Sequence, residues 1–310
     1  MNKKILKDQL FRYFLIVGSC LILAIFISMF WVLYQGAAPV LKIFGLKFLY
    51  TADWDPVHNK FGALTPLFGT IITSLIAISI AAPLGFAMAF FIREIAPKSL
   101  QNLLRISFEL LAGIPSIIYG MWGLLQFAPF FAKHISPILT NTLGQNAIIG
   151  FLFQASPSGI GILSAAIILS IMILPFITAV LCDAFTLVPS LLKESAYGLG
   201  ATRWEVAWYI ILPYSKVAFI GGIILALGRA LGETMAVSFI IGNSHRFSSS
   251  LLMPGSTISS VLANEFTEAT TLLHSSSIIA LGFILFILTF CIIALSQILL
   301  TRLRGGYLHD

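Results

Sequence analysis

Long apolar stretches occupy most of this chain, and they constrain its fold more than any other feature of the sequence. The 310 residues are 58% hydrophobic and only 10% charged, whereas soluble domains carry about 25% charged residues. A helix needs about 20 apolar residues to cross the hydrocarbon core of a bilayer. Six stretches are long enough, at residues 13–34, 66–92, 104–126, 160–182, 215–241 and 276–301. The sequence therefore predicts an all-α, polytopic membrane protein with six transmembrane helices.

The positions of lysine and arginine predict how these helices are oriented. Short loops rich in these residues stay on the cytoplasmic side of the membrane. With both termini inside, the outer side carries only Lys42, Lys47, Lys60, Lys133 and Arg246. The inner side then carries Lys3, Lys4, Lys7, Arg12, Arg93, Lys98, Arg105, Lys193, Arg203, Lys216, Arg302 and Arg304. The net charge of +6 is thus explained by topology, and it gives no reason to expect a nucleic-acid partner.

The N-terminal stretch has two possible interpretations, a cleaved signal peptide or a membrane anchor. Lys3, Lys4 and Lys7 precede the apolar residues 13–34, as in a signal peptide. The apolar core of a signal peptide is about 7–15 residues long, and this stretch is longer. We therefore expect an uncleaved anchor.

Residues that could hold a metal or cofactor are spread thinly along the chain. Cys20, Cys182 and Cys291 lie in or at the end of apolar stretches, where a lone cysteine packs as a small hydrophobe. The five histidines, at positions 58, 134, 245, 274 and 309, lack metal-ligand spacing. No lysine follows a glycine, so the phosphate loop of ATPases is absent. We expect no cofactor, no metal site and no ATP hydrolysis by this chain itself.

A long inner loop at residues 183–214 has the properties of a docking surface. Residues 189–200 predict a short helix that ends at a glycine. Thr202 and Glu205 have the spacing of a capping box, which predicts the start of a second helix. Two short helices at the membrane surface can place an apolar face in a groove of another protein. The alternative is an ordinary loop between two spans.

The fifth apolar stretch contains two charged residues, Arg229 and Glu233. A charge near the centre of a bilayer costs at least about 3 kcal/mol, so such residues face a bundle interior or an aqueous path. The two residues are four apart, which places them on one face of a continuous helix. They could form a buried bridge that only fixes helix packing. They could also line a substrate path, because the planar arginine fork binds oxyanions with two parallel hydrogen bonds.

Two motifs resemble those of known transport proteins. The run from Glu194 to Pro213 resembles the EAA motif of permease subunits in bacterial ABC importers, with Ser195 where the motif usually has alanine. The motif positions are Glu194, Ala196, Gly200, Ile210, Leu212 and Pro213. The segments GRALGETMAV (228–237) and ELLAGIPSIIYG (109–120), with Trp54, Asp55 and Pro56, are similar to the PstC family of phosphate importer permeases. This resemblance covers nearly the whole chain.

The resemblance implies a fold, partners and site residues. The fold would be that of type I (MetI-like) ABC importer permeases, a single transmembrane domain over 1–310 with its core at 66–301. The partners would be a PstA-like sister permease, two PstB-like ATPases, a PstS-like phosphate-binding protein, inorganic phosphate and membrane lipid. The loop at 183–214 would couple to the ATPases, and Arg229 and Glu233 would match charged residues that the family needs for transport. The location would be the bacterial inner membrane.

Other functions remain open on the residues alone. Arg229 fits sulfate or molybdate as well as phosphate. An intramembrane enzyme would use Arg229 and Glu233 on a lipid phosphate, although beyond Glu233 there is no paired acid and base at a shared depth, and Glu109 is unassigned. An ion-coupled carrier would show inverted repeats, and no convincing repeat is present.

Overall fold

A computed structural model of the protein describes residues 3–154 and 158–305, and the described residues are mainly helical. The longer helices are α1 (Lys3–Phe44), α3 (Leu64–Phe90), α4 (Lys98–Ala112), α8 (Ile162–Thr186), α11 (Leu212–Leu231) and α14 (Leu272–Gly305). The shorter ones are α2 (Lys47–Tyr50), α5 (Ser116–Trp122), α6 (Ala128–Phe130), α7 (Ser136–Thr142), α9 (Ser190–Gly198), α10 (Arg203–Val206), α12 (Met235–Ile241) and α13 (Ile258–Glu265). Wider, π-helical turns occur at η1 (Phe91–Ile95), η2 (Gly123–Phe127), η3 (Phe131–Ile135) and η5 (Ala207–Ile211). A tighter, 3₁₀ turn occurs at η4 (Gly150–Phe153).

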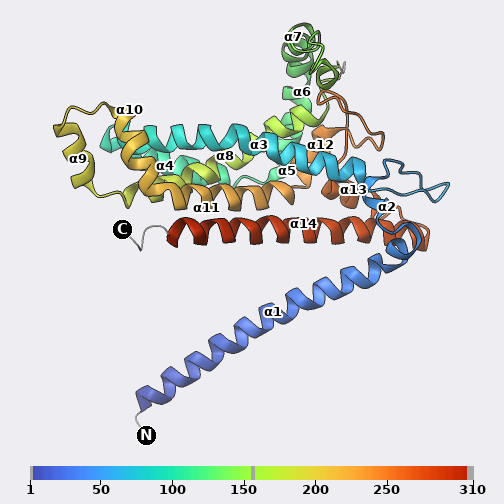
Figure 1. The fold of residues 1–310 in the computed structure, drawn as a ribbon, viewed down its shortest axis with the longest axis horizontal. Coiled ribbons are helices and arrows are strands. Elements are labelled where there is room, and N and C mark those ends of the chain that lie inside the picture. The colour runs from blue at the N-terminus through green and yellow to red at the C-terminus, as the bar shows by residue number, and fades with distance from the viewer. Residues whose placement is uncertain (1–2, 155–157, 306–310) are drawn as a thin grey trace.

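Helices α3, α8, α11 and α14 run side by side along the long axis of the molecule (Figure 1). One end of this bundle carries α9, α10 and the C-terminal end of α14. The other end carries α2, α13 and the loop at residues 242–257. Helices α6 and α7 stand out from the bundle, across its long axis. In this view the beginning of α1 and the end of α14 point towards the α9 end.

The centre of the core is the contact between α3 and α8. A Cβ atom at Gly85 of α3 would lie 2.7 Å from Ile177 Cγ2 of α8, so the two helices approach each other closely at this glycine. Ala77 and Ala81 of α3 are fully buried, as are Leu169 and Ile173 of α8. Without water between apolar helices, close van der Waals contact through small residues is what holds them together. The two helices therefore form a closely packed pair at the centre of the bundle.

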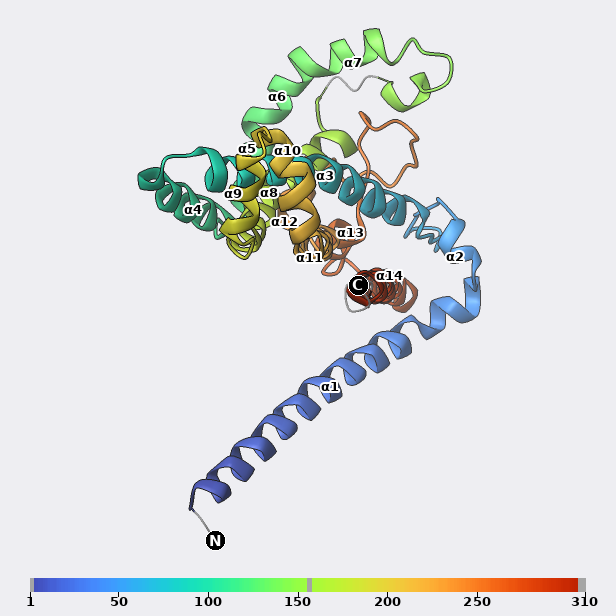
Figure 2. The same cartoon turned by 60° about the vertical axis from the view of Figure 1, so that its left-hand side comes forward.

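Helix α1 diverges from the bundle, as Figure 2 shows. Every side chain from residue 9 to residue 32 is exposed. The second half of the helix meets α14, where the rings of Phe26 and Phe286 lie 4.9 Å apart and Gly36 adjoins Ile279. An apolar helix of this length is stable only where lipid or another apolar protein surface covers it.

Within the described residues, five helices are long and apolar enough to cross a membrane, and a bent pair could form a sixth span. The predicted span at 104–126 is not one continuous helix, because α4 ends at Ala112 and the next helix leaves at an angle of 86°. Pro115 lacks an N–H and biases the residue before it away from helix. The predicted span at 215–241 is also interrupted, since α11 ends at Leu231 and α12 begins at Met235.

Candidate functional site

The break between α11 and α12 contains the two charged residues of the fifth span. Arg229 lies in the last turn of α11, and its side chain is exposed. Glu233 follows the end of α11, and its backbone N–H donates to Ala230 O at 3.3 Å. Because the helix ends between them, the two residues do not share a helical face. In the described part of the chain, Arg229 forms no ion pair, so the predicted neutralising pair is not present within this subunit.

Glu233 instead supports the start of α12. Its Oε1 atom accepts a hydrogen bond from the backbone N–H of Ala236 at 3.2 Å. The hydroxyl of Thr234 donates to Gly232 O at 3.2 Å. A carboxylate beside the first turn of a helix satisfies an otherwise unpaired N–H group. Glu233 is half-buried and held by this contact, whereas the Arg229 side chain is exposed.

Helix α5 packs against α12 and completes the surroundings of the break. A Cβ atom at Gly120 would lie 2.9 Å from Ala236 Cα, so this glycine allows the two helices to touch. Tyr119, one residue earlier, donates its hydroxyl proton to Leu111 O at 3.0 Å. The break therefore combines an exposed cation, Arg229, with a fixed carboxylate, Glu233, and α5 packs against the helix that follows it.

The inner loop has the local structure that the sequence predicts at its beginning. The short helix expected at 189–200 is α9. Gly200 has φ +87°, and the N–H of Ala201 donates to Ala196 O at 3.0 Å. The residue that follows the end of a helix often has a left-handed backbone conformation, and such a residue is usually glycine. Gly200 of the motif therefore forms the turn between α9 and the next segment.

The second helix of this loop begins as predicted and continues further than expected. Thr202 and Glu205 form the capping box, with Glu205 Oε2 accepting from Thr202 N at 2.7 Å. The helix then runs through the wide turn η5 into α11 as one 29-residue segment. It is therefore the first part of the fifth span and not a separate surface helix. Ile210 packs on the core within η5, while Leu212 and Pro213 begin α11.

Large apolar side chains are exposed around these two helices. Glu194 is exposed on α9, and Ala196 packs against the core. The exposed apolar residues, called here the inner apolar surface, are Leu187, Leu191, Leu199, Trp204, Trp208 and Tyr209. Exposed apolar patches of this kind mark contacts with proteins or membranes.

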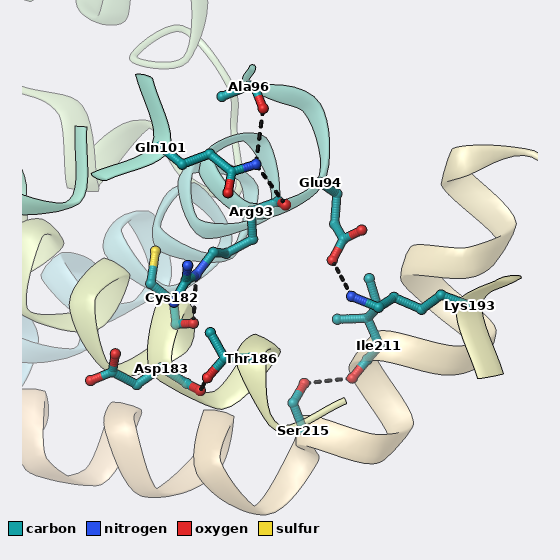
Figure 3. A network of polar contacts seen from close by, with 10 residues as sticks. All are labelled: Arg93, Glu94, Ala96, Gln101, Cys182, Asp183, Thr186, Lys193, Ile211 and Ser215. Carbon is teal, nitrogen blue, oxygen red and sulfur yellow. Dashed lines mark hydrogen bonds and ion pairs between the residues drawn. The ribbon is translucent and has the colours of Figure 1, made fainter. Parts of the chain in front are cut away.

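At the same end of the bundle, polar contacts join the end of α3, the start of α4, the end of α8 and helix α9 (Figure 3). Arg93 Nε donates to Cys182 O at 3.0 Å, and Gln101 Nε2 donates to Ala96 O at 2.9 Å. Lys193 Nζ lies 2.9 Å from Glu94 Oε1. No sequence motif marks this network.

At the opposite end, histidines that appear scattered in the sequence converge on one carboxylate. Glu265 Oε2 accepts from Trp54 Nε1 at 2.8 Å and lies 2.9 Å from His274 Nε2. Glu265 Oε1 lies 2.9 Å from His245 Nε2. Burial raises the pKa of Glu265, but the hydrogen bonds from the two imidazoles and the indole outweigh it and hold this pKa below its ordinary value of 4.5. His309 lies outside the described residues.

In the described part of the chain, a cavity of about 570 Å³ lies among α8, α11 and α14 and is lined mostly by apolar residues such as Val180, Ile224 and Ile293. This cavity does not provide a polar path through the subunit. Among the described residues, no group of three or more His, Cys, Asp or Glu side chains could hold a metal ion. The Arg229 side chain is exposed, so a path past it would need a second protein surface.

Comparison with known proteins identifies the family. Residues 81–305 match the family described as "Binding-protein-dependent transport system inner membrane component". The "Phosphate transport system permease protein PstC" of Xylella fastidiosa (strain 9a5c) is 49% identical over 296 residues, covering 96% of this chain and 91% of that protein. The protein of the same name from Pasteurella multocida (strain Pm70) is 46% identical and covers 97% of this chain and 92% of its own length.

A solved structure confirms the predicted fold. A chain of a bacterial alginate ABC transporter, crystallised with an alginate pentasaccharide-bound periplasmic protein, superposes with a TM-score of 0.62. It is 17% identical, and the match covers 94% of both chains. The structure is therefore that of a MetI-like ABC importer permease, a multi-pass membrane protein. By its sequence and its fold, the chain belongs to the PstC family of binding-protein-dependent permeases.

Proposed function

We propose that this chain is the permease subunit of an ATP-driven phosphate importer and forms the translocation path together with a sister permease. The observation that carries the proposal is the exposed side chain of Arg229 within the long apolar fifth span. A bare guanidinium at this depth costs at least about 3 kcal/mol. That cost is avoided when the residue faces a water-filled path between two proteins. The relatives named as phosphate transport permeases support phosphate as the substrate.

The chemistry at the helix break suits a passing anion. Arg229 keeps its donors free for an oxyanion, since no described side chain pairs with it. The guanidinium fork can give two parallel hydrogen bonds to phosphate. Glu233 stays fixed at the start of α12 by its contact with Ala236 N. Its negative charge near the path weakens anion binding, so that phosphate is released instead of trapped.

The inner apolar surface is where we place the ATPase subunits. Glu194 and the exposed aromatic residues Trp204 and Trp208 project from α9 and the start of the fifth span. Two PstB-like ATPases would bind this surface and its counterpart on a PstA-like sister permease. Both termini of the chain would then be cytoplasmic, with 66–301 as the permease core and 183–214 as the coupling loop. A PstS-like binding protein would deliver phosphate at the end that carries α13.

The proposed cycle follows from this arrangement. ATP binding draws the ATPases together, and their movement displaces α9 and the inner end of the fifth span. The bundle then alternates between outward and inward access to Arg229. The chain itself hydrolyses no ATP, and its contribution is positioning and electrostatic guidance of the anion.

The test is transport by the reconstituted complex of both permeases, the ATPases and the binding protein in proteoliposomes. Labelled phosphate should accumulate only with ATP and binding protein present, and excess sulfate or molybdate should not compete. Uptake driven by an ion gradient without ATP would favour an ion-coupled carrier. Consumption of a lipid phosphate without transport would favour an intramembrane enzyme. Either result would contradict the proposal.

A further inference from the structure

Helix α9 carries Leu191 of the inner apolar surface, yet it is weakly embedded in the protein. None of its nine residues is buried. Ala196 makes its apolar contact with the core. An element with so little buried surface can tilt or slide independently of the bundle. Transmission of force through α9 therefore needs a specific attachment to the membrane helices.

The ion pair between Lys193 of α9 and Glu94 of η1 is such an attachment. The Nζ and Oε1 atoms are 2.9 Å apart, and the two side chains are only 20% and 11% exposed. Exposed ion pairs contribute little to stability. In a partly buried pair, removal of one partner leaves a charge without compensation, so the two groups stay together. Figure 3 shows Lys193 reaching across from α9 to Glu94.

Glu94 lies in a segment that is held by hydrogen bonds to α4 and α8. It lies in η1, a wide π-turn that ends α3, and such turns often mark functional positions in helices. Its neighbour Arg93 donates from Nε to Cys182 O of α8 at 3.0 Å. Gln101 of α4 donates from Nε2 to Arg93 O at 3.3 Å and Ala96 O at 2.9 Å. A displacement of Glu94 is thus shared by α3, α4 and α8.

From this base, close packing leads to the helix break that holds Arg229. Helix α8 contacts both α11 and α12. A Cβ atom at Gly222 of α11 would lie 3.1 Å from Val180 Cγ1 of α8. Rigid helices in close contact move together because packed interfaces do not deform continuously. A continuous series of packed elements therefore connects α9, through Glu94, with the anion site proposed at Arg229.

We propose that the Glu94–Lys193 ion pair is the mechanical link that transmits movement of α9 to the α3–α8 core. Both are positioning residues, because neither lies at the helix break that holds Arg229. The inference rests on the proposed function, in which ATPases act on α9. It adds that transport coupling depends on the pairing of these two charges and not on either charge alone.

The experiment is a charge exchange in the full reconstituted complex. The variants are Glu94→Lys, Lys193→Glu and the double exchange, with Lys98→Glu as a matched control. Lys98 is an exposed lysine at the start of α4, so its reversal makes the same change of charge close to the same end of the bundle. Assembly, basal ATPase activity and phosphate taken up per ATP hydrolysed are measured for each. The ratio reports coupling, which a purely structural defect would not change in assembled complexes.

Each single variant should assemble and hydrolyse ATP, while phosphate uptake per ATP falls at least about tenfold because a partly buried charge loses its partner. The double exchange should restore most of the wild-type phosphate uptake per ATP, and Lys98→Glu should leave this ratio unchanged. If charge reversal prevents assembly, the same three quantities are measured for Glu94→Gln and Lys193→Met. A wild-type ratio in assembled single variants, or no recovery in the double exchange, would overturn the link. Absence of phosphate uptake by the wild-type complex would instead overturn the proposed function.

Discussion

The indole Nε1–H of Trp54 donates a hydrogen bond of 2.8 Å to the buried carboxylate of Glu265, across 211 positions of sequence. This bond ties the loop after α2 to the end of α13. His245 and His274 approach the same carboxylate from two further segments. The Trp54 ring also stacks on His245, with centroids 6.0 Å apart. Glu265 is therefore the point at which the loops at this end of the bundle are held together.

Loss of this carboxylate should loosen that end of the protein. In Glu265→Gln, the amide cannot accept from all three donors, and its NH2 group faces a donor. Unsatisfied buried groups cost about 1–3 kcal/mol each, so we expect a clear fall in the melting temperature of the purified complex. His58→Gln is the control, because His58 is exposed in a surface turn with Asp55. An equal effect of both variants would contradict the role of Glu265.

The same cluster predicts how stability depends on pH. The pKa of Glu265 lies below its ordinary value of 4.5, since the hydrogen bonds from His245, His274 and Trp54 outweigh the effect of burial. A lowered folded-state pKa gives stability that is present above the unfolded pKa and is lost as pH falls through the folded one. The stability difference between wild type and Glu265→Gln should persist down to pH 4.5 and shrink below it. Thermal unfolding of both proteins across this range measures it.

The turn at Gly200 should tolerate a side chain much less well than the helix before it. Gly200 has φ +87°, and Gly198 lies in α9, although a Cβ atom would meet nothing within 4 Å at either position. An L-residue in the left-handed region costs about 1–2 kcal/mol, whereas alanine in a helix is favourable. Gly200→Ala should weaken ATPase binding and uptake, and Gly198→Ala should not. Copurification of the ATPase subunits and uptake by membrane vesicles test this pair.

Close contact between α5 and α12 should be needed for the anion site. A Cβ atom at Gly120 would lie 2.9 Å from Ala236 Cα, while one at Gly221 would have no neighbour within 4 Å. Overpacking costs about 1–3 kcal/mol and displaces backbone. Gly120→Ala should reduce phosphate uptake in complexes that still assemble, and Gly221→Ala should leave uptake unchanged. Equal uptake by the two variants would show that the contact has no role in transport.

Much of the fold follows from the sequence because long apolar stretches have few alternatives in a membrane. The spans around 66–92, 160–182 and 276–301 correspond to α3, α8 and α14. The capping box of Thr202 and Glu205 is present in the structure. These features depend on local composition and spacing, which a sequence displays directly.

The structure goes beyond the sequence prediction where a helix breaks within an apolar stretch or where distant segments meet. Hydropathy continues across Pro115, so it does not reveal the 86° bend. It also continues across Gly232, where the fifth span breaks and separates Arg229 from Glu233. The convergence of Trp54, His245 and His274 on Glu265 joins distant segments, and no spacing rule predicts it. The roles of Arg229 and Glu233 in transport, expected from the family resemblance, stay predictions.

The most direct test of the account is phosphate uptake and phosphate-stimulated ATPase activity in vesicles that hold the complete complex, with wild type compared with Arg229→Gln. Because Arg229 is exposed and forms no ion pair among the described residues, its replacement should leave assembly intact. The account predicts that uptake is lost while the complex assembles and hydrolyses ATP. Full phosphate uptake by the variant would contradict the claim that Arg229 lines the phosphate path.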